Sequence, residues 1–180
     1  MIRRFIILFN LLVFATVICY AQRTSSSENP YKKQLLAQAN LMGNALMRSD
    51  YDTFCKYTHP SVIKGVGGKG EMIKSIVELN KTLKQQGAFI AGFLISNPGK
   101  IIKTNNELQC TLQQRVNMVF GKKRGFYSST LIAISADGGK NWLFATAVNK
   151  DLAAMKKVLP NLSMDIVILP TTPLKYYNQK

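Results

Sequence analysis

The chain has one histidine, and two aspartates lie a short distance before it. Asp50, Asp52 and His59 fall in the stretch RSDYDTFCKYTHPSVIKGVGGKGEM, residues 48–72. Because imidazole titrates near neutral pH, His59 is a candidate general base, and Asp50 or Asp52 would orient its ring. The same residue types also have structural roles, since a histidine before proline can cap a helix end and carboxylates at a helix start bind free backbone amides. The sequence is compatible with both roles.

Glycines follow the histidine closely, at Gly65, Gly67, Gly68 and Gly70. A phosphate-binding loop of the P-loop type follows a strand and ends in Lys-Ser or Lys-Thr. This run has neither feature, so we interpret it as a connection between two helices.

One polar side chain, Gln114, interrupts the apolar face of a long predicted strand. It shares the parity of Leu112 and Val116, so we expect it to face the helices. A buried amide needs hydrogen-bond partners. The next strand carries the hydroxyls of Tyr127, Ser129 and Thr130. These groups either line one cavity together with Gln114 or bond one another across the strands.

The segment SADGGKNW, residues 135–142, fits the pattern Ser-x-Asp-x-Gly-x-x-Trp that is familiar from sialidase-like propellers. A propeller needs repeated blades, and this chain has one copy of the pattern. Asp137 can bond the amides that follow it, and the two glycines accept positive φ angles. We therefore expect a structural hairpin with Trp142 packed over the turn.

Basic residues number 24 and acidic residues 9, which gives a formal net charge of +15. The lysines and arginines are scattered, with one tight group at residues 122–124 and no interleaved aromatic residues that would stack on bases. We expect a solvated basic surface and no nucleic-acid partner.

Cys55 and Cys110 sit on a predicted helix and a predicted strand. They either pair as a disulfide in an oxidising compartment or serve as small core residues. Their spacing is not that of a metal site, and one histidine adds no ligand set, so we expect no metal and no other cofactor.

Apolar residues recur at steps of three and four from Tyr31 to Arg48, which predicts an amphipathic helix. Asp50 predicts the cap of a second, short helix that ends before Pro60. A third helix runs from about Met72 and stops at Gly87.

After Gly87 the apolar period changes from helical to alternating, which predicts strands. We expect strands at residues 88–96, 108–120, 126–136 and 142–148, then a helix from Asp151 to Val158 and a last strand at 165–169. This order predicts an α+β fold, in which N-terminal helices pack in the concave face of a curved antiparallel sheet.

The N-terminus has the composition of a bacterial-type signal peptide. Arg3 and Arg4 precede an apolar run that is short for a bilayer span and ends near the small residue Ala21. We expect cleavage after Ala21, export to the periplasm or the extracellular space, and no transmembrane segment. Lipid attachment at Cys19 is disfavoured because the branched Ile18 precedes it.

The expected organisation is therefore a signal peptide over residues 1–21 and a polar linker over residues 22–30. A single domain follows over residues 31–169, and residues 170–180 form a flexible tail.

The stretch RSDYDTFCKYTHPSVIKGVGGKGEMIKSI, residues 48–76, resembles the opening of nuclear transport factor two-like proteins, also called cystatin-like or polyketide cyclase-like. The features in common are an Asp-Tyr-Asp turn after a helix, a second helix closing on His-Pro, a Gly-Gly-Lys loop and a helix leading into the sheet. The resemblance covers residues 31–150.

The resemblance implies a cone, in which the sheet curls around a helix and leaves a pocket at its wider end. Relatives include ketosteroid isomerase, with an aspartate base and a protonated acid as hydrogen-bond donor, and dehydratases or cyclases with a His-Asp pair. No residue of this chain matches either catalytic set, and the long strand offers Gln114 in place of an acid.

The resemblance also implies a homodimer, because relatives pair through the outer face of the sheet. The residues that we expect on that face are Val119, Leu131 and Ala133.

We therefore expect an exported, non-enzymatic binding or accessory module with a pocket for a small, partly apolar ligand or a protein partner. The candidate ligand-binding residues are His59, Asp52, Gln114 and Tyr127, and we name no catalytic residue. The alternative is an isomerase, dehydratase or hydrolase that uses His59 as its general base.

Overall fold

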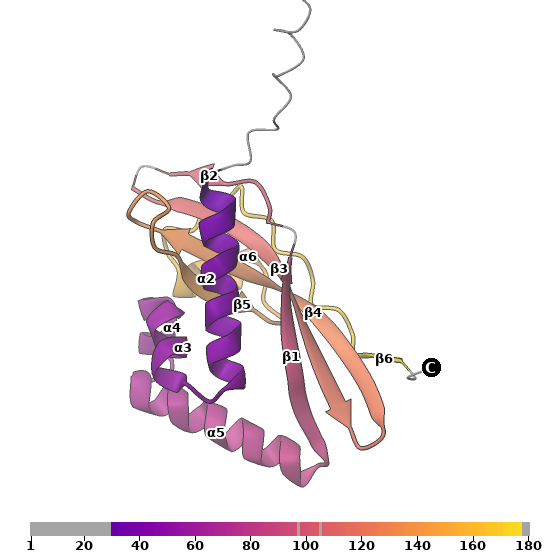
Figure 1. The fold of residues 1–180 in the computed structure, drawn as a ribbon. Helices are drawn as coiled ribbons and strands as arrows, with labels where there is room; N and C mark the ends of the chain where they lie inside the picture. Colours follow the sequence, from indigo (N-terminus) through magenta and orange to yellow (C-terminus); the bar gives the residue numbers. More distant parts are fainter. Residues whose placement is uncertain (1–29, 97, 105, 178–180) are drawn as a thin grey trace, which may run out of the picture. The chain divides into compact units, whose positions relative to one another are not determined.

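The computed structural model describes residues 30–177, except residues 97 and 105. The α+β class is confirmed: helices come first in the chain, and an open antiparallel sheet of six strands follows (Figure 1). The helices are α2 (Pro30–Met47), α3 (Tyr51–Tyr57), α4 (Pro60–Gly65), α5 (Lys69–Gln85) and α6 (Leu152–Val158). The strands are β1 (Ala88–Ser96), β2 (Ile102–Lys103), β3 (Leu108–Phe120), β4 (Lys123–Ser135), β5 (Leu143–Ala147) and β6 (Lys175–Tyr177).

The expected signal peptide and most of the expected linker lie outside the described residues. Within the described part, none of the helices is long and apolar enough to cross a bilayer.

The sheet has the order β1-β3-β4-β5, with β2 paired to β3 and β6 paired to β4. The long strands β3 and β4 form its centre and pair along their whole length, from Leu108 opposite Ser135 to Phe120 opposite Lys123. A bulge between Ile90 and Gly92 interrupts the pairing of β1 with β3. Alternation in the sequence predicted these strands correctly because each central strand buries at least one face.

One face of the sheet packs against α2, which runs along it in Figure 1. Leu35, Ala39 and Met42 of α2 are buried, and their spacing of four and three residues places them on one side of the helix. They share a core cluster with residues of β1, β3, β4 and β5, which are Ile95, Leu108, Cys110, Leu112, Leu131, Ala133 and Phe144.

Two residues expected on the outer, dimer-forming face belong to this core. Leu131 and Ala133 are fully buried on the α2 side, because they pair directly with Leu112 and Cys110, and paired residues share a face. The expectation for these two residues was wrong. Apolar residues occupy both parities in this part of β4, so alternation could not decide which set faces α2.

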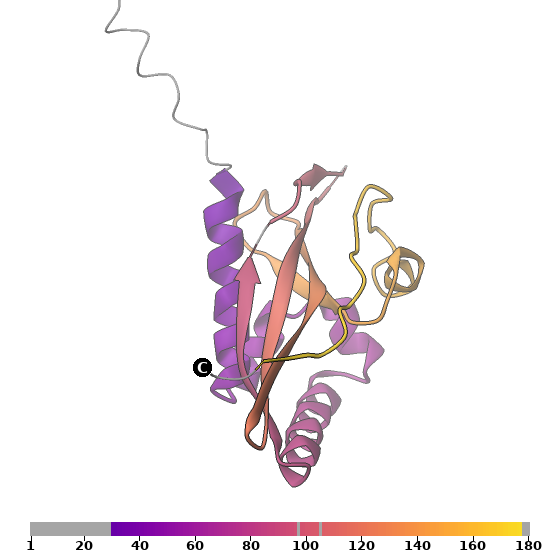
Figure 2. The ribbon, with the colours of Figure 1, turned by 90° about the vertical axis from the view of Figure 1, so that its right-hand side faces the viewer.

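The opposite face of β4 and β5 is covered too, by α6 and the segment that follows it (Figure 2). Ile132 and Ile134 of β4 pack there with Met155 of α6 and with Leu159 and Leu162. The apolar run from Leu131 to Ile134 is thus buried on both faces, as in strands that lie between two layers.

The segment after α6 differs from expectation in two places. Residues 165–169, expected as a strand, have no regular secondary structure. Residues 170–180, expected as a flexible tail, include β6, which pairs antiparallel with β4 from Arg124 to Phe126. The amide of Thr172 also donates to the carbonyl of Ser128 at 2.9 Å.

Cys55 and Cys110 are both free and buried. They therefore serve as small core residues and do not form a disulfide. Burial raises the pKa of the Cys55 thiol, and it raises the pKa of Cys110 to about 11.

The hairpin between β4 and β5 is structural, as expected. Asp137 accepts the backbone amide of Asn141 at 2.9 Å and its side-chain amide at 2.6 Å, and the Ser135 hydroxyl donates to Asp137 at 2.9 Å. The indole of Trp142, fully buried, donates to the carbonyl of Gly139 at 3.0 Å.

Helix α2 holds this hairpin through two side chains, and Gln34 donates to the carbonyl of Lys140 at 3.3 Å. Gln38 accepts the backbone amide of Trp142 at 2.7 Å and donates to the carbonyl of Lys140 at 2.8 Å. The turn thereby fixes the N-terminal half of α2 on the sheet.

We expect Asp137 to make the protein sensitive to acid. The bonds from Asn141 lower the pKa of Asp137 from 3.8 to about 2, so its contribution to stability is complete above about pH 4 and is lost as the pH falls toward 2. In Asp137→Asn this contribution no longer titrates, so the melting temperature should fall less between about pH 4.5 and pH 2 than in the parent.

Calorimetry at the two pH values measures this difference. Asp165→Asn is the control, because Asp165 is exposed and lies outside the hairpin. An Asp137→Asn variant with the same pH dependence as the parent would contradict the role of this carboxylate.

Candidate functional site

His59 caps α4. Its Nδ1 accepts the backbone amide of Ser61 at 3.2 Å, and its own amide donates to the carbonyl of Phe144 at 2.8 Å. An accepting Nδ1 puts the proton of the neutral ring on Nε2, so neither nitrogen is free to take a proton from a substrate. Burial lowers the pKa of His59, and the Glu107 carboxylate acts in the opposite direction.

Asp50 and Asp52 bind other partners. Asp50 accepts the amide of Thr53 at 3.1 Å as the N-cap of α3. Hydrogen bonding to the Thr53 side chain, and then to its amide, lowers the pKa of Asp50. Asp52 forms an ion pair with Lys69 at 2.6 Å. In the described part of the chain, neither carboxylate makes a hydrogen bond or an ion pair with His59.

Pro60 begins a helix instead of only following one. It occupies the first turn of α4, a short helix that was not expected, where a proline needs no amide hydrogen. The glycines then join α4 to α5, as expected for a connection between helices. Gly67 and Gly68 have φ angles of 93° and 105°, which a residue with a side chain rarely adopts.

Gln114 faces the helices, as its parity predicted, and lies opposite Ser129 on β4. Gln114 is 8% exposed and Ser129 is 1% exposed. Gln114 Oε1 and Ser129 Oγ have no hydrogen-bond partner within the described structure. The cross-strand bond that we considered between them is therefore not formed, and the two atoms make a buried polar pair with unused bonding capacity.

The other hydroxyls of β4 are divided between the two faces. Tyr127 lies on the same face as Gln114 and is half-buried, and burial raises the pKa of its phenol. Thr130 faces the opposite side, where its hydroxyl donates to the carbonyl of Leu169 at 3.2 Å and accepts the Leu169 amide at 3.0 Å. Thr130 is thus not part of the same group.

A groove of about 920 Å³ opens between the C-terminal end of α2, the helix α5 and the strand β1. Its lining residues are Leu46, Met47, Ser49, Tyr51, Ile76, Val77, Leu79, Asn80, Lys81, Lys84, Gln85, Phe89, Ile90 and Phe93. His59, Asp52, Gln114 and Tyr127 are not among them. The volume is in the range of about 300–1,000 Å³ that is usual for small-molecule sites.

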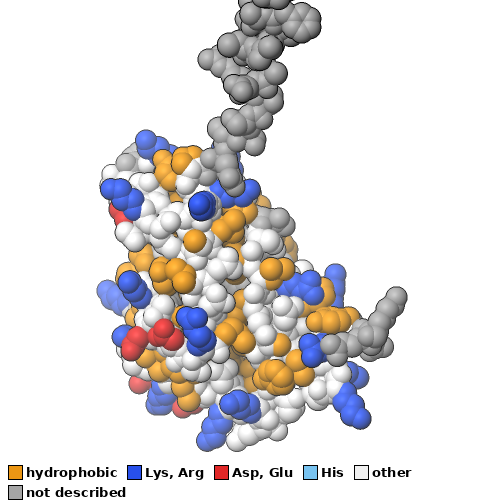
Figure 3. Space-filling model, in the orientation of Figure 1, with side chains coloured by type: hydrophobic (Ala, Val, Ile, Leu, Met, Phe, Trp, Pro, Cys, Tyr) orange, Lys and Arg blue, Asp and Glu red, His pale blue; other side chains and the backbone are white. Residues whose placement is uncertain are grey.

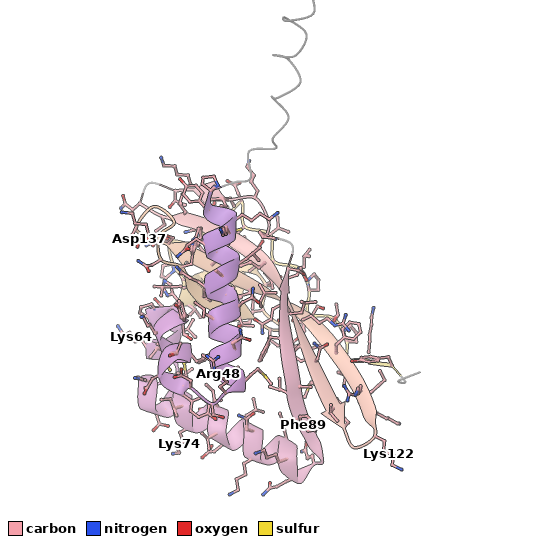
Figure 4. The ribbon with its side chains drawn as sticks, viewed as in Figure 1. Arg48, Lys64, Lys74, Phe89, Lys122 and Asp137 are labelled. Carbon is pink, nitrogen blue, oxygen red and sulfur yellow. The ribbon has the colours of Figure 1, made fainter. Side chains whose placement is uncertain are left out.

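Large apolar side chains of this groove are exposed to solvent. Val77 is 45% exposed, Leu79 54% and Phe89 50%. Phe89 comes from the end of β1 that adjoins α5 (Figure 4). The groove therefore offers apolar area that a ligand could bury.

Phe93 separates the groove from the buried polar pair. Its side chain lies against α2 at Gly43, where an added Cβ would meet Phe93 Cβ at 3.4 Å. Phe93 pairs with Val116, and Ile95 pairs with Gln114. Gln114 is thus two residues along β3 from Val116, the residue that pairs with Phe93 of the groove wall, and lies on the same face of the sheet.

Sequence reasoning missed the groove because four elements, α2, α3, α5 and β1, contribute to its lining, and tertiary packing decides which of their side chains face one another. One signal was present in α5, whose apolar positions are Met72, Ile73, Ile76, Val77, Leu79 and Leu83. Only Met72 among them is buried. A helix that carries more apolar side chains than it can bury against its neighbours exposes some of them on a second side.

The arrangement is suited to binding. Among the residues that the structure describes, no group of three or more histidines, cysteines or carboxylates is placed to hold a metal ion. The groove itself contains no histidine, cysteine or carboxylate.

Two glutamines of β3 should respond oppositely to replacement by leucine. Gln109 is fully buried and bonded, because it donates to the Asn161 carbonyl at 3.0 Å and accepts the Ser163 amide at 2.8 Å. Gln109→Leu should lower the free energy of unfolding by about 1–3 kcal/mol, since it leaves these groups without partners. Gln114→Leu removes an acceptor without a partner, so unfolding stability should stay level or rise by about 1 kcal/mol.

Urea unfolding of the parent and the two variants measures both changes. A loss of stability in Gln114→Leu as large as that in Gln109→Leu would mean that Gln114 is bonded in solution.

Comparisons with known proteins identify no relative. No family model, no curated protein and no solved structure matches this chain. Any proposal for its function rests on the sequence and on the geometry of the groove.

Proposed function

We propose that this protein is an exported, non-enzymatic binding module of the nuclear transport factor two-like type, and that its groove takes a small, partly apolar ligand. One observation carries the proposal: a groove of about 920 Å³ whose walls include exposed, large apolar side chains from three separate elements. Soluble proteins leave such side chains uncovered in one place mainly where something binds.

The position of the groove supports a cone-like fold. Helix α2 packs on one face of the sheet, and α5 makes its contacts with β1 at the sheet edge. A cone has its pocket at an open end, between a helix and the sheet. Here the groove lies where the C-terminal end of α2, α5 and β1 meet.

The buried polar pair suits the same proposal. Gln114 lies opposite Ile95, two residues along β1 from Phe93 in the groove wall. Its Oε1 can accept a hydrogen bond from a ligand or a water molecule, and Ser129 Oγ can accept or donate one. The candidate residues Gln114 and Tyr127 therefore stay in the proposal as a polar region behind Phe93.

Among the described residues, the contacts of His59 and Asp52 do not support the enzymatic alternative. A general base needs a free lone pair near a cavity, and an orienting carboxylate would hold its ring. His59 Nδ1 is used by the Ser61 amide, and Asp52 is used by Lys69. The proposal is for that reason limited to binding.

The matched variants Val77→Trp and Val66→Trp test the groove. Both valines are exposed to a similar extent, 45% and 46%, but only Val77 lines the groove. Indole at position 77 fills the cavity, so binding of the neutral probe decan-1-ol should weaken about tenfold or more, while Val66→Trp should bind as the parent does.

Titration calorimetry measures these affinities, and circular dichroism confirms that both variants fold. The proposal fails if the parent does not bind decan-1-ol, or if Val77→Trp binds it as tightly as Val66→Trp does.

Export has its own test. Expressed in a secreting bacterial host, the mature chain should begin at Gln22, because signal peptidases require a small residue such as Ala21 before the cut. N-terminal sequencing of the processed protein measures this, with Ala21→Arg as a variant that should stay uncleaved at that bond. An intact Met1 in the parent, or a lipid on Cys19, would refute it.

A further inference from the structure

We infer that the groove selects free amphipathic anions, with an alkyl chain against its apolar walls and one carboxylate at Lys81 and Lys84. The inference rests on the proposed function and adds the chemical class of the ligand. It follows from how polar and apolar groups are distributed along the groove.

Helix α5 turns one stripe of side chains toward the groove. The stripe consists of Ile76, Val77, Asn80, Lys81, Lys84 and Gln85, which recur at steps of about four residues, and Leu79 lines the groove beside it. Its first turn is apolar, and its later turns are polar or cationic. An occupant that lies along α5 therefore meets an apolar surface first and two ammonium groups further on.

The walls opposite the lysines remain apolar. Phe89 and Ile90 follow α5 directly in the chain, so they lie near the lysine end, whereas Phe93 lies against α2 at Gly43. Lysine side chains lay their methylene groups along such surfaces and keep the ammonium group at the rim. The groove thus accepts a chain along its length and a charge at one end.

The charge of the groove is of one sign. Its lining includes Lys81 and Lys84 and no aspartate or glutamate. Figure 3 shows Lys and Arg side chains over the second half of α5, whereas acidic side chains lie near α3 and over the first half of α5. A net charge of +15 adds a long-range attraction for anions.

The two lysines have no acidic partner in the described part of the chain. The lysines near the start of α5 do have partners: Lys69 with Asp52 at 2.6 Å, and Lys74 with Glu71 at 4.0 Å. Glu78 is three residues before Lys81 but forms no ion pair with it. Charge complementarity at this end of the groove is therefore left to a ligand.

The dipole of α5 acts against an anion at this position. The C-terminus of a helix carries about half a negative charge, and Lys84 lies in the last turn. Two full positive charges exceed that partial charge. Their excess is what gives the site a preference for an anion over a neutral or cationic head.

Three probes with the same alkyl chain test the inference: decanoate, decan-1-ol and decylammonium. The parent should bind decanoate about three- to tenfold more tightly than decan-1-ol, and decylammonium most weakly. The preference for decanoate should shrink when NaCl rises from about 0.05 M to 0.5 M, since exposed charges are screened.

The double variant Lys81→Gln, Lys84→Gln should lose most of the preference for decanoate, so that its affinities for decanoate and decan-1-ol become nearly equal. Lys32→Gln, Lys33→Gln is the matched control, because it removes the same charge from exposed lysines of α2 that do not line the groove. Titration calorimetry gives all the affinities, and circular dichroism verifies folding.

The outcomes separate the two proposals. Equal affinity of the parent for decanoate and decan-1-ol, or equal effects of the two double variants, overturns the anion preference and leaves the binding groove intact. Binding to phosphatidylglycerol vesicles without binding to decanoate also overturns it, because the ligand would then be a membrane. If the parent binds neither decanoate nor decan-1-ol, the groove itself is wrong as a site.

Discussion

The structure depends on the two-sided burial of one strand. The C-terminal half of β4, from Ser129 to Ser135, is buried throughout, whereas five of its first six residues, all except Gly125, are exposed or half-buried. Leu131 and Ala133 hold α2, and Ile132 and Ile134 hold α6 and the segment after it. Both layers are therefore placed at the same end of the sheet. At the other end β3, β4 and β1 extend beyond this double cover, and the groove forms where α5 meets β1.

Much of the fold could be predicted from local patterns, and what could not depends on contacts between distant segments. The strands β1 and β3 have the expected bounds because alternation and turn glycines are local signals. Pro60 fits both the end of one helix and the start of the next, so α4 was missed. The assignment of Leu131 to the outer face failed because its neighbours are apolar on both parities, and only the pairing with Leu112 decides it. The residues that line the groove follow no single sequence period, since four elements contribute them.

Gln109 and Gln114 show that the role of a buried glutamine depends on which face of the sheet it occupies. They lie on one strand, five positions apart, and both are buried. Gln109 fastens the segment after α6 to the sheet through Asn161 and Ser163, so its amide replaces the backbone pairing that an irregular segment lacks. Gln114 lies toward α2 beside Ser129, with an acceptor that has no partner in the described structure. A buried acceptor without a partner lowers the stability of the fold. Its presence therefore says more about function than the bonded side chain of Gln109 does.

The width of the groove follows from a single backbone turn. Helix α5 and strand β1 are its two main walls, and Gln86 and Gly87 alone connect them. Gly87 has a φ of 68°, and its amide donates a hydrogen bond to the Lys84 carbonyl at 3.0 Å at the end of the helix. The Gly87 carbonyl accepts the Gly121 amide at 2.9 Å. Nothing lies within 4 Å of a Cβ at this position, so conformation and not space requires the glycine. Because Gly121 belongs to the turn between β3 and β4, the corner that sets the two walls apart is bound to the central pair of strands. The groove is therefore held by the central pair of strands, although side chains of its own walls, such as Val77, Leu79 and Phe89, are exposed. Such a rigid frame lowers the entropy lost when a ligand fills it.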